Sequence, residues 1–182
     1  MKLLATGIAD VKLIEPRVLG DQRGFFFESW NAATFKHLGI RANFVQDNHS
    51  RSAKGVLRGL HYQIHQAQGK LVRVTAGAVY DVVVDLRRGS ATFGRSEGVE
   101  LSAVNRLMLW IPPGFAHGFL SLEDDTEFLY KCTDFYAPEH EFALLWNDPA
   151  LAIDWPLARV GTLVLSAKDQ AAVPLAQART FA

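Results

Sequence analysis

Short hydrophobic stretches, broken by glycine or polar turns, dominate this chain, and this pattern is typical of β-strands rather than helices. The predicted strands are residues 25–30, 55–63, 70–75, 79–86, 98–104, 107–111, 118–122 and 126–135. The segment Ala76-Gly77-Ala78 joins two of them, and Gly77 is free to take the positive φ that a tight hairpin needs. The pattern therefore predicts a protein made mostly of β-strands.

Few stretches predict helix. Residues 31–38 can form a short helix with Asn31 as its N-cap and Gly39 as its stop. A second helix is expected within residues 167–178, broken near Pro174 because proline lacks the amide that a helix interior needs. Many short strands with few helices predict an antiparallel β-barrel or a double-sheet jelly roll. Such folds enclose a cavity whose mouth is the expected place for a small-molecule site.

Length and charge narrow the range of functions. The chain has 182 residues and no internal repeat, low-complexity tract or linker, so residues 1–182 are expected to form a single domain. Lys plus Arg and Asp plus Glu both total 19, so the formal net charge is zero. This balance argues against a broad nucleic-acid surface, but it allows a local basic pocket for one phosphorylated ligand.

The single cysteine and the N-terminal segment bear on location. Cys132 cannot form an intramolecular disulfide, and a reducing compartment is the simpler expectation. The first apolar run is short and is interrupted by Asp10 and Lys12, whereas a secretory signal needs a longer apolar core. No stretch approaches the roughly 18 apolar residues of a membrane span. We therefore expect a cytoplasmic protein with no membrane partner.

The segment 55–63, Gly-Val-Leu-Arg-Gly-Leu-His-Tyr-Gln, places Arg58 and His61 inside an apolar strand. His61 could be a hydrogen-bonded wall histidine or an acid–base group, since imidazole titrates near neutral pH. An inward-facing Arg58 would need a partner, and a phosphate would serve. The two residues have opposite parity in a regular strand, so Gly59 would have to mark a bulge for both to face one side.

Four further residues are candidates on weaker grounds. Lys70 begins a strand directly after a glycine, where a cation can lean into a barrel mouth, although a solvated strand-end lysine is the simpler interpretation. His117 follows a Pro-Gly turn at the start of a strand. Tyr130 lies in a strand, where it is either a structural ring or a general acid facing the cavity. Asp169 either caps the last helix or orients a histidine.

Metal binding has to be weighed, because jelly rolls often hold a metal. The segment 112–117 matches the Pro-x-Gly-x-x-His half of the cupin metal pattern, but the other half needs His-x-His followed closely by Glu. The chain has only His61 and His65 there, with no nearby Glu, so no metal is expected. Cys132 is interpreted as a core thiol, and no Gly-x-Gly-x-x-Gly or phosphate loop indicates a dinucleotide fold.

The motifs together resemble the cupin-fold dTDP-4-dehydrorhamnose 3,5-epimerases of the dTDP-L-rhamnose pathway. The resemblance extends from about residue 21 to residue 169. Its blocks are Asp-Gln-Arg-Gly-Phe at 21–25, Glu28, Phe-Val-Gln-Asp-Asn at 44–48, residues 55–63, 68–73, 81–87 and 110–119, Phe-Leu-Tyr-Lys at 128–131, Trp-Asn-Asp-Pro at 146–149, and Lys168-Asp169. So many separate blocks in one order argue against a chance match.

The resemblance implies an all-β, cupin-type jelly-roll β-barrel with a few short helices. It also implies an isomerase that inverts C3 and C5 of dTDP-4-dehydro-6-deoxy-D-glucose without a cofactor. His61 matches the family's base and Asp169 its carboxylate partner, Tyr130 matches the tyrosine that returns a proton on the opposite face, and Lys70 matches the lysine beside the keto oxygen. The matches to positions lining the nucleotide and sugar site are Arg23, Glu28, Gln46, Asn48, Arg58, His117, Glu141 and Lys168.

The resemblance further implies a homodimer that exchanges N-terminal strands and takes a nucleotide sugar as substrate. The chain departs from the family pattern at Ile64-His65-Gln66, where many members carry prolines, and at Ala78, where an acidic residue is frequent. Neither departure affects a proposed catalytic residue. Three alternatives stay open: an epimerase that inverts only C3 or only C5, a metal-dependent cupin oxygenase, and a sugar-binding barrel without catalysis.

Overall fold

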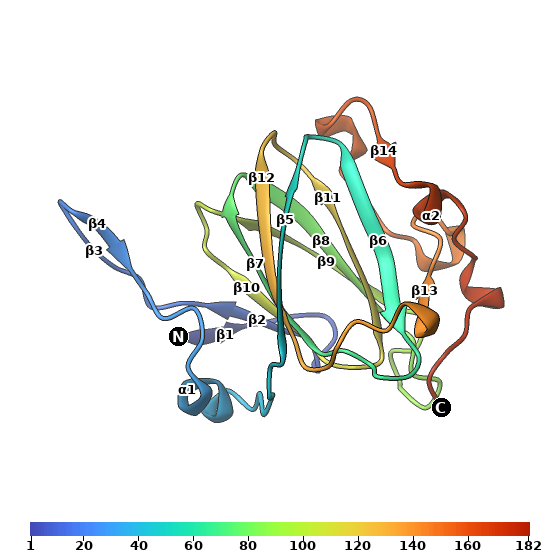
Figure 1. The fold of residues 1–182 in the computed structure, drawn as a ribbon, viewed down its shortest axis with the longest axis horizontal. Helices are drawn as coiled ribbons and strands as arrows, with labels where there is room; N and C mark the ends of the chain where they lie inside the picture. Colours follow the sequence, from blue (N-terminus) through green and yellow to red (C-terminus); the bar gives the residue numbers. More distant parts are fainter.

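The protein is built mainly from β-strands, which form two facing sheets in the computed structural model of residues 1–182 (Figure 1). The first sheet has the strand order β1-β2-β10-β7-β12-β5. The second has the order β13-β6-β11-β8-β9, and β14 pairs in parallel with β6. The strands are β1 Lys2–Leu4, β2 Lys12–Glu15, β3 Leu19–Asp21, β4 Gly24–Phe26, β5 Gln46–Ser52, β6 Val56–Gln63, β7 Lys70–Ala76, β8 Ala78–Asp85, β9 Ser96–Ser102, β10 Met108–Ile111, β11 Phe115–Ser121, β12 Thr126–Cys132, β13 Glu141–Ala143 and β14 Val164–Leu165.

Seven of the eight predicted strands have counterparts whose ends differ by a few residues, whereas the predicted strand 25–30 is mostly wrong, because β4 ends at Phe26. The predicted hairpin is wrong: Gly77 does take a positive φ of +70°, but β7 pairs with β10 and β12 while β8 pairs with β11 and β9, so the turn carries the chain from the first sheet to the second. β5 was not predicted, since its sequence, Gln-Asp-Asn-His-Ser-Arg-Ser, contains no hydrophobic residue. It lies at the edge of the first sheet, where alternate side chains are exposed. A polar edge strand of this kind gives no hydrophobic signal.

β3 and β4 form a separate hairpin that extends away from both sheets (blue in Figure 1). Its large apolar side chains are uncovered, with Leu19, Phe25 and Phe26 exposed by 53%, 60% and 66%. Arg106 places its guanidinium 4.4 Å from the centre of the Phe25 ring. Clustered apolar side chains of this size usually meet a partner surface, which the rest of this chain does not supply.

Helix is confined to short segments, as predicted. α1 (Ala32–His37) begins after Asn31, whose side chain accepts hydrogen bonds from two backbone amides, and it ends before Gly39, whose φ is +80°. α2 covers only Ala167–Gln170, and the chain is not helical through Pro174. The 3₁₀ turns are η1 Pro138–His140, η2 Pro149–Leu151, η3 Leu157–Arg159 and η4 Leu175–Gln177.

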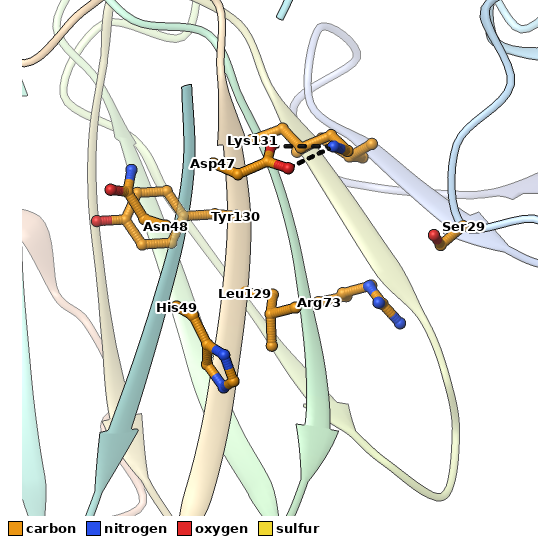
Figure 2. Close-up of a pocket in the computed structure, with 9 residues that line it drawn as sticks. Ser29, Asp47, Asn48, His49, Arg73, Leu129, Tyr130 and Lys131 are labelled. Carbon is orange, nitrogen blue, oxygen red and sulfur yellow. Dashed lines mark hydrogen bonds and ion pairs between the residues drawn. The ribbon is translucent and has the colours of Figure 1, made fainter. Parts of the chain in front are cut away.

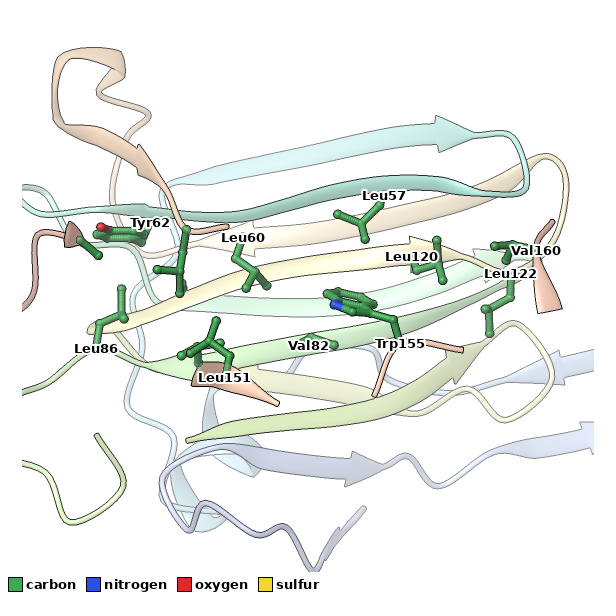
Figure 3. Close-up of a cluster of buried hydrophobic side chains, with 14 of the residues drawn as sticks. Leu57, Leu60, Tyr62, Val82, Leu86, Leu120, Leu122, Leu151, Trp155 and Val160 are labelled. Carbon is green, nitrogen blue, oxygen red and sulfur yellow. The ribbon is translucent and has the colours of Figure 1, made fainter. Parts of the chain in front are cut away.

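Three hydrophobic clusters hold these layers together. One lies between the sheets and contains side chains from both, such as Val72 of β7 and Val83 of β8. The second covers the outer face of the second sheet, where Trp155 from the C-terminal segment joins leucines of β6 and β11 (Figure 3). The third joins α1 to the outer face of the first sheet around Phe35, which is fully buried. Close packing of this kind fixes the side chains that face each other across the interior.

A bulge in β6 resolves the opposite parity of Arg58 and His61. His61 pairs with His117 and Arg58 with Phe119, so β6 has one more residue than β11 over this stretch. Gly59 lies in the bulge with φ of +116°, and a Cβ there would lie 2.6 Å from the Cα of Gly118. The extra residue turns Arg58 and His61 to the same side, and the predicted bulge is confirmed.

Candidate active site

A cavity of about 430 Å³ opens between the two sheets, and polar side chains from both sheets line it. The lining residues able to carry charge or move a proton are Arg58, His61, Lys70, His117, Tyr130, Ser166 and Asp169. They come from β6, β7, β11, β12 and the start of α2. Six of the residues predicted from the sequence therefore meet in one cavity.

His61 is paired with the carboxylate of Asp169. Its Nε2 lies 2.6 Å from Asp169 Oδ1, while Ser166 Oγ donates to Oδ2 at 2.6 Å and the Gly59 amide donates to Oδ1 at 3.3 Å. Burial alone would raise the pKa of Asp169, but the hydrogen bonds from His61 and Ser166 outweigh it, and the pKa is lowered. An ionised Asp169 accepts the Nε2–H of His61, which leaves the imidazole lone pair on Nδ1. Asp169 thus orients a histidine.

A second histidine–aspartate pair in the same cavity is more deeply buried. His117 Nε2 lies 2.9 Å and 3.1 Å from the two carboxylate oxygens of Asp81, and the side chains are 8% and 0% exposed. His117 and His61 are direct partners across β11 and β6. Burial raises the pKa of Asp81, against the opposing effects of His117 and Lys70. The two imidazoles thus stand side by side in different surroundings.

Lys70 and Tyr130 line the cavity from the first sheet, across from the two histidines. The buried side-chain polar atoms that lack a hydrogen-bond partner are Tyr62 Oη and Arg106 Nε. Lys70 Nζ and Tyr130 Oη are not among them. Burial lowers the pKa of the Lys70 ammonium and raises the pKa of the Tyr130 phenol. An ammonium and a phenol are therefore available to a ligand opposite an oriented imidazole.

Gln46 and Asn48 lie on β5 beside the cavity. Asn48 is the cross-strand partner of Tyr130, and Gln46 Nε2 donates to Asn48 Oδ1 at 3.0 Å. Figure 2 shows Asn48 and Tyr130 pointing to one side of the sheet, while Arg73 and Lys131 point to the other. Asn48 therefore shares the face of Tyr130 that is turned toward the cavity.

A second pocket, of about 230 Å³, is the one drawn in Figure 2. Most of its lining comes from β5, β7 and β12, on the face of the first sheet that points away from the larger cavity. Its charged groups are partly paired with each other, and Lys131 Nζ lies 2.9 Å from both carboxylate oxygens of Asp47. It does not contain the paired histidines or Lys70, which belong to the larger cavity.

Charged groups flank the cavity on the side of the second sheet. Glu141 forms an ion pair with Lys168 and accepts a hydrogen bond from Tyr136 Oη at 2.8 Å. Burial would raise the pKa of Glu141, but these two contacts outweigh it and the pKa is lowered. Arg58 donates from Nε to Ser52 Oγ at 3.1 Å and has no carboxylate partner. The guanidinium of Arg58 remains free to bind an anion.

Arg23 and Glu28 do not meet the cavity within one chain. Arg23 lies on the projecting hairpin, where its guanidinium pairs with Asp21, and its side chain is 85% exposed. Glu28 follows the hairpin and accepts a hydrogen bond from Asn31 Nδ2 at 2.8 Å. A single chain therefore brings together the catalytic candidates without these two binding candidates.

Three polar residues of the site were not predicted from the sequence. Asp81 interrupts the apolar segment 79–86, and a carboxylate in such a segment signals a buried acid that needs a partner. Ser166 lies three residues before Asp169, the spacing of a capping box. Tyr136 lies in an exposed loop, and its sequence surroundings give no signal.

No three side chains among the His, Cys, Asp and Glu residues come together as a metal-binding group. The lack of a metal or cofactor in the working protein stays a prediction. None of the helices has the length and apolar character needed to cross a membrane.

The fold and the cavity define a class of protein. It is a two-sheet β protein whose interior cavity is lined by an oriented imidazole, a phenol and an ammonium group without a protein partner. Such a set suits proton transfer beside a carbonyl group, where an imidazole removes a proton and cations stabilise the oxygen that becomes negative.

Comparison with known proteins agrees with this class. The family model for dTDP-4-dehydrorhamnose 3,5-epimerase matches residues 5–177. The dTDP-4-dehydrorhamnose 3,5-epimerase of Pseudomonas aeruginosa is 60% identical over 182 residues, covering 100% of this chain and 99% of the relative. The chain belongs to the dTDP-4-dehydrorhamnose 3,5-epimerase family.

Solved structures extend the comparison. The 3,5-epimerase of Legionella pneumophila, in complex with dTDP-4-keto-L-rhamnose, is 54% identical with a TM-score of 0.94, covering 98% of this chain and 94% of that one. A 3′-monoepimerase of Streptomyces bikiniensis, in complex with dTDP-quinovose, is 36% identical with a TM-score of 0.84, covering 91% of this chain and 84% of that one. The same architecture therefore occurs in double and single epimerases.

Proposed function

We propose that this protein epimerises dTDP-4-dehydro-6-deoxy-D-glucose at C3 and C5 to give dTDP-4-dehydro-L-rhamnose. The observation that carries the proposal is that His61 and Tyr130 line one cavity from facing sheets, with Lys70 beside them. Inversion of a carbon requires a proton to leave one face of the sugar and return on the other, so it needs two such groups. The complex of the similar Legionella enzyme with dTDP-4-keto-L-rhamnose supports this substrate class.

The proposed chemistry begins at His61 Nδ1, which takes the proton next to the C4 ketone. The Nε2–H of the same ring stays bonded to Asp169, which stabilises the imidazolium that forms. The negative charge of the resulting enolate collects on the C4 oxygen, where Lys70 stabilises it more than it stabilises the ketone. Tyr130 then returns a proton from the opposite face, and exchange with solvent removes the proton from His61 and restores that of Tyr130 before the second centre is inverted. Positioned acid–base groups of this kind contribute about 10²–10⁴-fold each.

Substrate binding is assigned to the groups around the cavity. Arg58, which has no carboxylate partner, is proposed to hold the diphosphate. The other proposed binding residues around the cavity are Gln46, Asn48, His117, Glu141 and Lys168. Binding of the nucleotide and diphosphate positions the sugar for the chemistry, so energy from the distant half of the substrate contributes to kcat.

Arg23 and Glu28 are proposed to act in the partner's cavity, in a homodimer that exchanges its N-terminal strands. The projecting hairpin and its uncovered Phe25 and Phe26 support this arrangement. Mixing Arg23→Ala protein with His61→Asn protein tests it. If Arg23 acts across the dimer, the mixed dimers contain one intact cavity and recover activity that neither variant has alone. Equal, low activity before and after mixing would place Arg23 in its own chain's site.

A proton-NMR time course with the keto-sugar nucleotide in D₂O tests the function. Deuterium should enter both C3 and C5, and the product should show both centres inverted. Inversion of one centre would identify the second candidate, a single epimerase, which the similarity to the Streptomyces bikiniensis 3′-monoepimerase favours as the alternative. Stoichiometric iron or manganese, with activity lost to a chelator, would instead indicate a metal-dependent oxygenase.

We also propose an architecture and a location for the protein. The two facing sheets are proposed to be the jelly roll of cupins, with residues 1–182 as one domain. The shared interior cluster, to which both sheets contribute, supports one domain, and limited proteolysis should release no stable fragment. A cytoplasmic location is proposed because the chain has a single, buried cysteine.

A further inference from the structure

The buried pair of His117 and Asp81 has no role in the proton transfers described above. Asp81 is fully buried, and His117 is the one side chain that forms a hydrogen bond with its carboxylate. Asp169, by contrast, accepts hydrogen bonds from His61, Ser166 and a backbone amide. A buried carboxylate with one hydrogen-bond partner is costly, so its retention inside the cavity wall calls for a functional explanation.

The imidazole of His117 has one nitrogen fixed and one nitrogen free. Nε2 is bonded to Asp81, whereas Nδ1 has no partner in the protein. The buried side-chain polar atoms that lack a hydrogen-bond partner are Tyr62 Oη and Arg106 Nε, so His117 Nδ1 is not shut off from the cavity. Because His117 lines the cavity, its Nδ1 is the atom available to a ligand there.

The number of protons on the pair decides what Nδ1 can do. With one proton, located between Nε2 and the carboxylate, the pair is negative and Nδ1 carries a lone pair. With two protons the pair is neutral and Nδ1 carries a hydrogen, whether the second proton is assigned to the imidazole or to the acid. Burial disfavours the charged state, and the raised pKa of Asp81 has this cause. The surroundings thus favour Nδ1–H.

The charged groups near the pair do not outweigh the effect of burial on Asp81. Lys70 on β7, which favours the ionised carboxylate, is directed at the same cavity, and other ionisable groups surround the pair. They are His61 and Arg58 on β6, Tyr130 and Cys132 on β12, Asp169 on α2 and Glu141 on β13. These groups include both carboxylates and cations, whose effects on the charge of the pair oppose each other. Burial remains the largest influence on the pKa of Asp81.

We propose that Asp81 is a positioning residue that keeps His117 Nδ1 protonated, so that His117 donates a hydrogen bond to the keto oxygen of the substrate. This inference rests on the proposed function, because it assigns a second donor to the same enolate. Lys70 reaches the cavity from the first sheet and His117 from the second. The two donors therefore approach the oxygen from facing sheets, while His61, the neighbour of His117, keeps its lone pair for the carbon-bound proton.

Nitrogen NMR of the wild-type protein tests the proton directly. The chain has six histidines, and ¹⁵N-labelled His117→Gln and His61→Asn proteins assign the two imidazoles. At neutral pH His117 Nδ1 should show the chemical shift of a protonated nitrogen, and His61 Nδ1 that of an unprotonated one. An unprotonated His117 Nδ1 overturns the proposal. This measurement needs no turnover, so it stands even if the proposed substrate is wrong.

Kinetics of Asp81→Leu test the consequence, because leucine is similar in shape and cannot hydrogen-bond to Nε2. We expect kcat to fall about 10²-fold, the effect of removing one oxyanion donor, with KM changed by less than about threefold. Combining Asp81→Leu with His117→Gln should add little to the loss caused by His117→Gln alone, because one residue acts through the other. Full additivity, or a loss in kcat below about threefold, overturns the proposal.

A matched control separates this role from the loss of a buried carboxylate. Asp85 lies on the same strand, is fully buried, and is held by Arg87, Ser90 and Thr92 outside the cavity. Asp85→Leu should lower the Tm while leaving kcat and the His117 Nδ1 signal unchanged. If Asp81→Leu does not fold, the wild-type NMR result still decides the proposal. If wild-type protein does not epimerise the substrate, the proposed function fails and the state of Nδ1 is decided separately.

Discussion

The cavity holds two histidine–aspartate pairs that share their chemistry and differ in their surroundings. The side chains of His61 and Asp169 are 26% and 3% exposed, and those of His117 and Asp81 are 8% and 0% exposed. Asp169 accepts three hydrogen bonds and its pKa is lowered, whereas Asp81 has only His117 and its pKa is raised by burial. The same two residue types can thus present a lone pair in one place and an N–H in the other.

The difference follows from how many donors each carboxylate has. Extra hydrogen bonds stabilise the ionised form of Asp169, so the pair can remain negative and His61 can act as a base. Without such donors, burial favours a neutral pair at Asp81. Neighbouring positions on paired strands are therefore not interchangeable, although His61 and His117 face each other directly.

The largest effect is expected from His61→Asn. Loss of the base should lower kcat by up to about 10⁴-fold and abolish exchange of substrate hydrogen with solvent deuterium. His117→Gln should cost about 10²-fold, the effect of one lost oxyanion donor, and should leave exchange detectable. NMR of substrate in D₂O measures both. Substantial exchange with His61→Asn would remove His61 as the base and end the contrast between the two pairs.

Lys70→Gln is expected to lower kcat about 10²–10³-fold, because the enolate oxygen loses its cation. Burial lowers the pKa of Lys70 from its ordinary 10.5, so wild-type kcat/KM should decline as pH rises through that lowered value. Lys70→Arg keeps a charged group to higher pH and should move this alkaline decline upward in its residual activity. An unchanged decline would assign the titration to another group.

Tyr130→Phe should impair inversion about 10²-fold while deuterium exchange by the His61 pair continues. The phenol acts after the carbon-bound proton has left, so the two rates should separate. Parallel NMR measurements of exchange and of product formation check this. Equal loss of exchange and inversion would show that Tyr130 is a structural tyrosine.

Gly59→Ala should lower the free energy of unfolding by at least about 2 kcal/mol, since φ of +116° and contact with the Gly118 backbone both oppose a side chain. The bulge places His61 beside His117, so the variant should also lose activity. Gly89→Ala, where a Cβ meets nothing within 4 Å, is the control and should be near neutral. Thermal unfolding of both proteins measures the difference, and equal Tm values would contradict it.

The smallest effect is expected from Ser166→Ala. Removing the hydroxyl that donates to Asp169 at 2.6 Å should cost about 1 kcal/mol, or about fivefold in kcat. Ser90 donates to Asp85 at the same distance but outside the cavity, so Ser90→Ala should affect stability and leave kcat unchanged. Equal kcat in the two variants would mean that donors to Asp169 do not set the chemistry of its pair.

Local signals predicted much of this protein. Hydrophobic runs and turns located the main strands, the turn at Gly77 and the helix capped by Asn31, because these features depend on residues close together in the chain. The strands on either side of Gly77 belong to different sheets, which the local pattern did not predict. The family motifs selected His61, Lys70, Tyr130 and the other site candidates. Polar β5 gave no such signal, because an edge strand does not need a hydrophobic face.

Only the tertiary structure could decide which carboxylate accompanies which histidine. Asp169 is 108 residues from His61, and Asp81 is 36 residues from His117. Both pairings arise from the register of the second sheet and from the C-terminal segment that packs beside it. The sequence determined the elements and the residue types through local periodicity. The structure decided burial and hydrogen-bond partners, which depend on distant contacts and which set the protonation state of each pair.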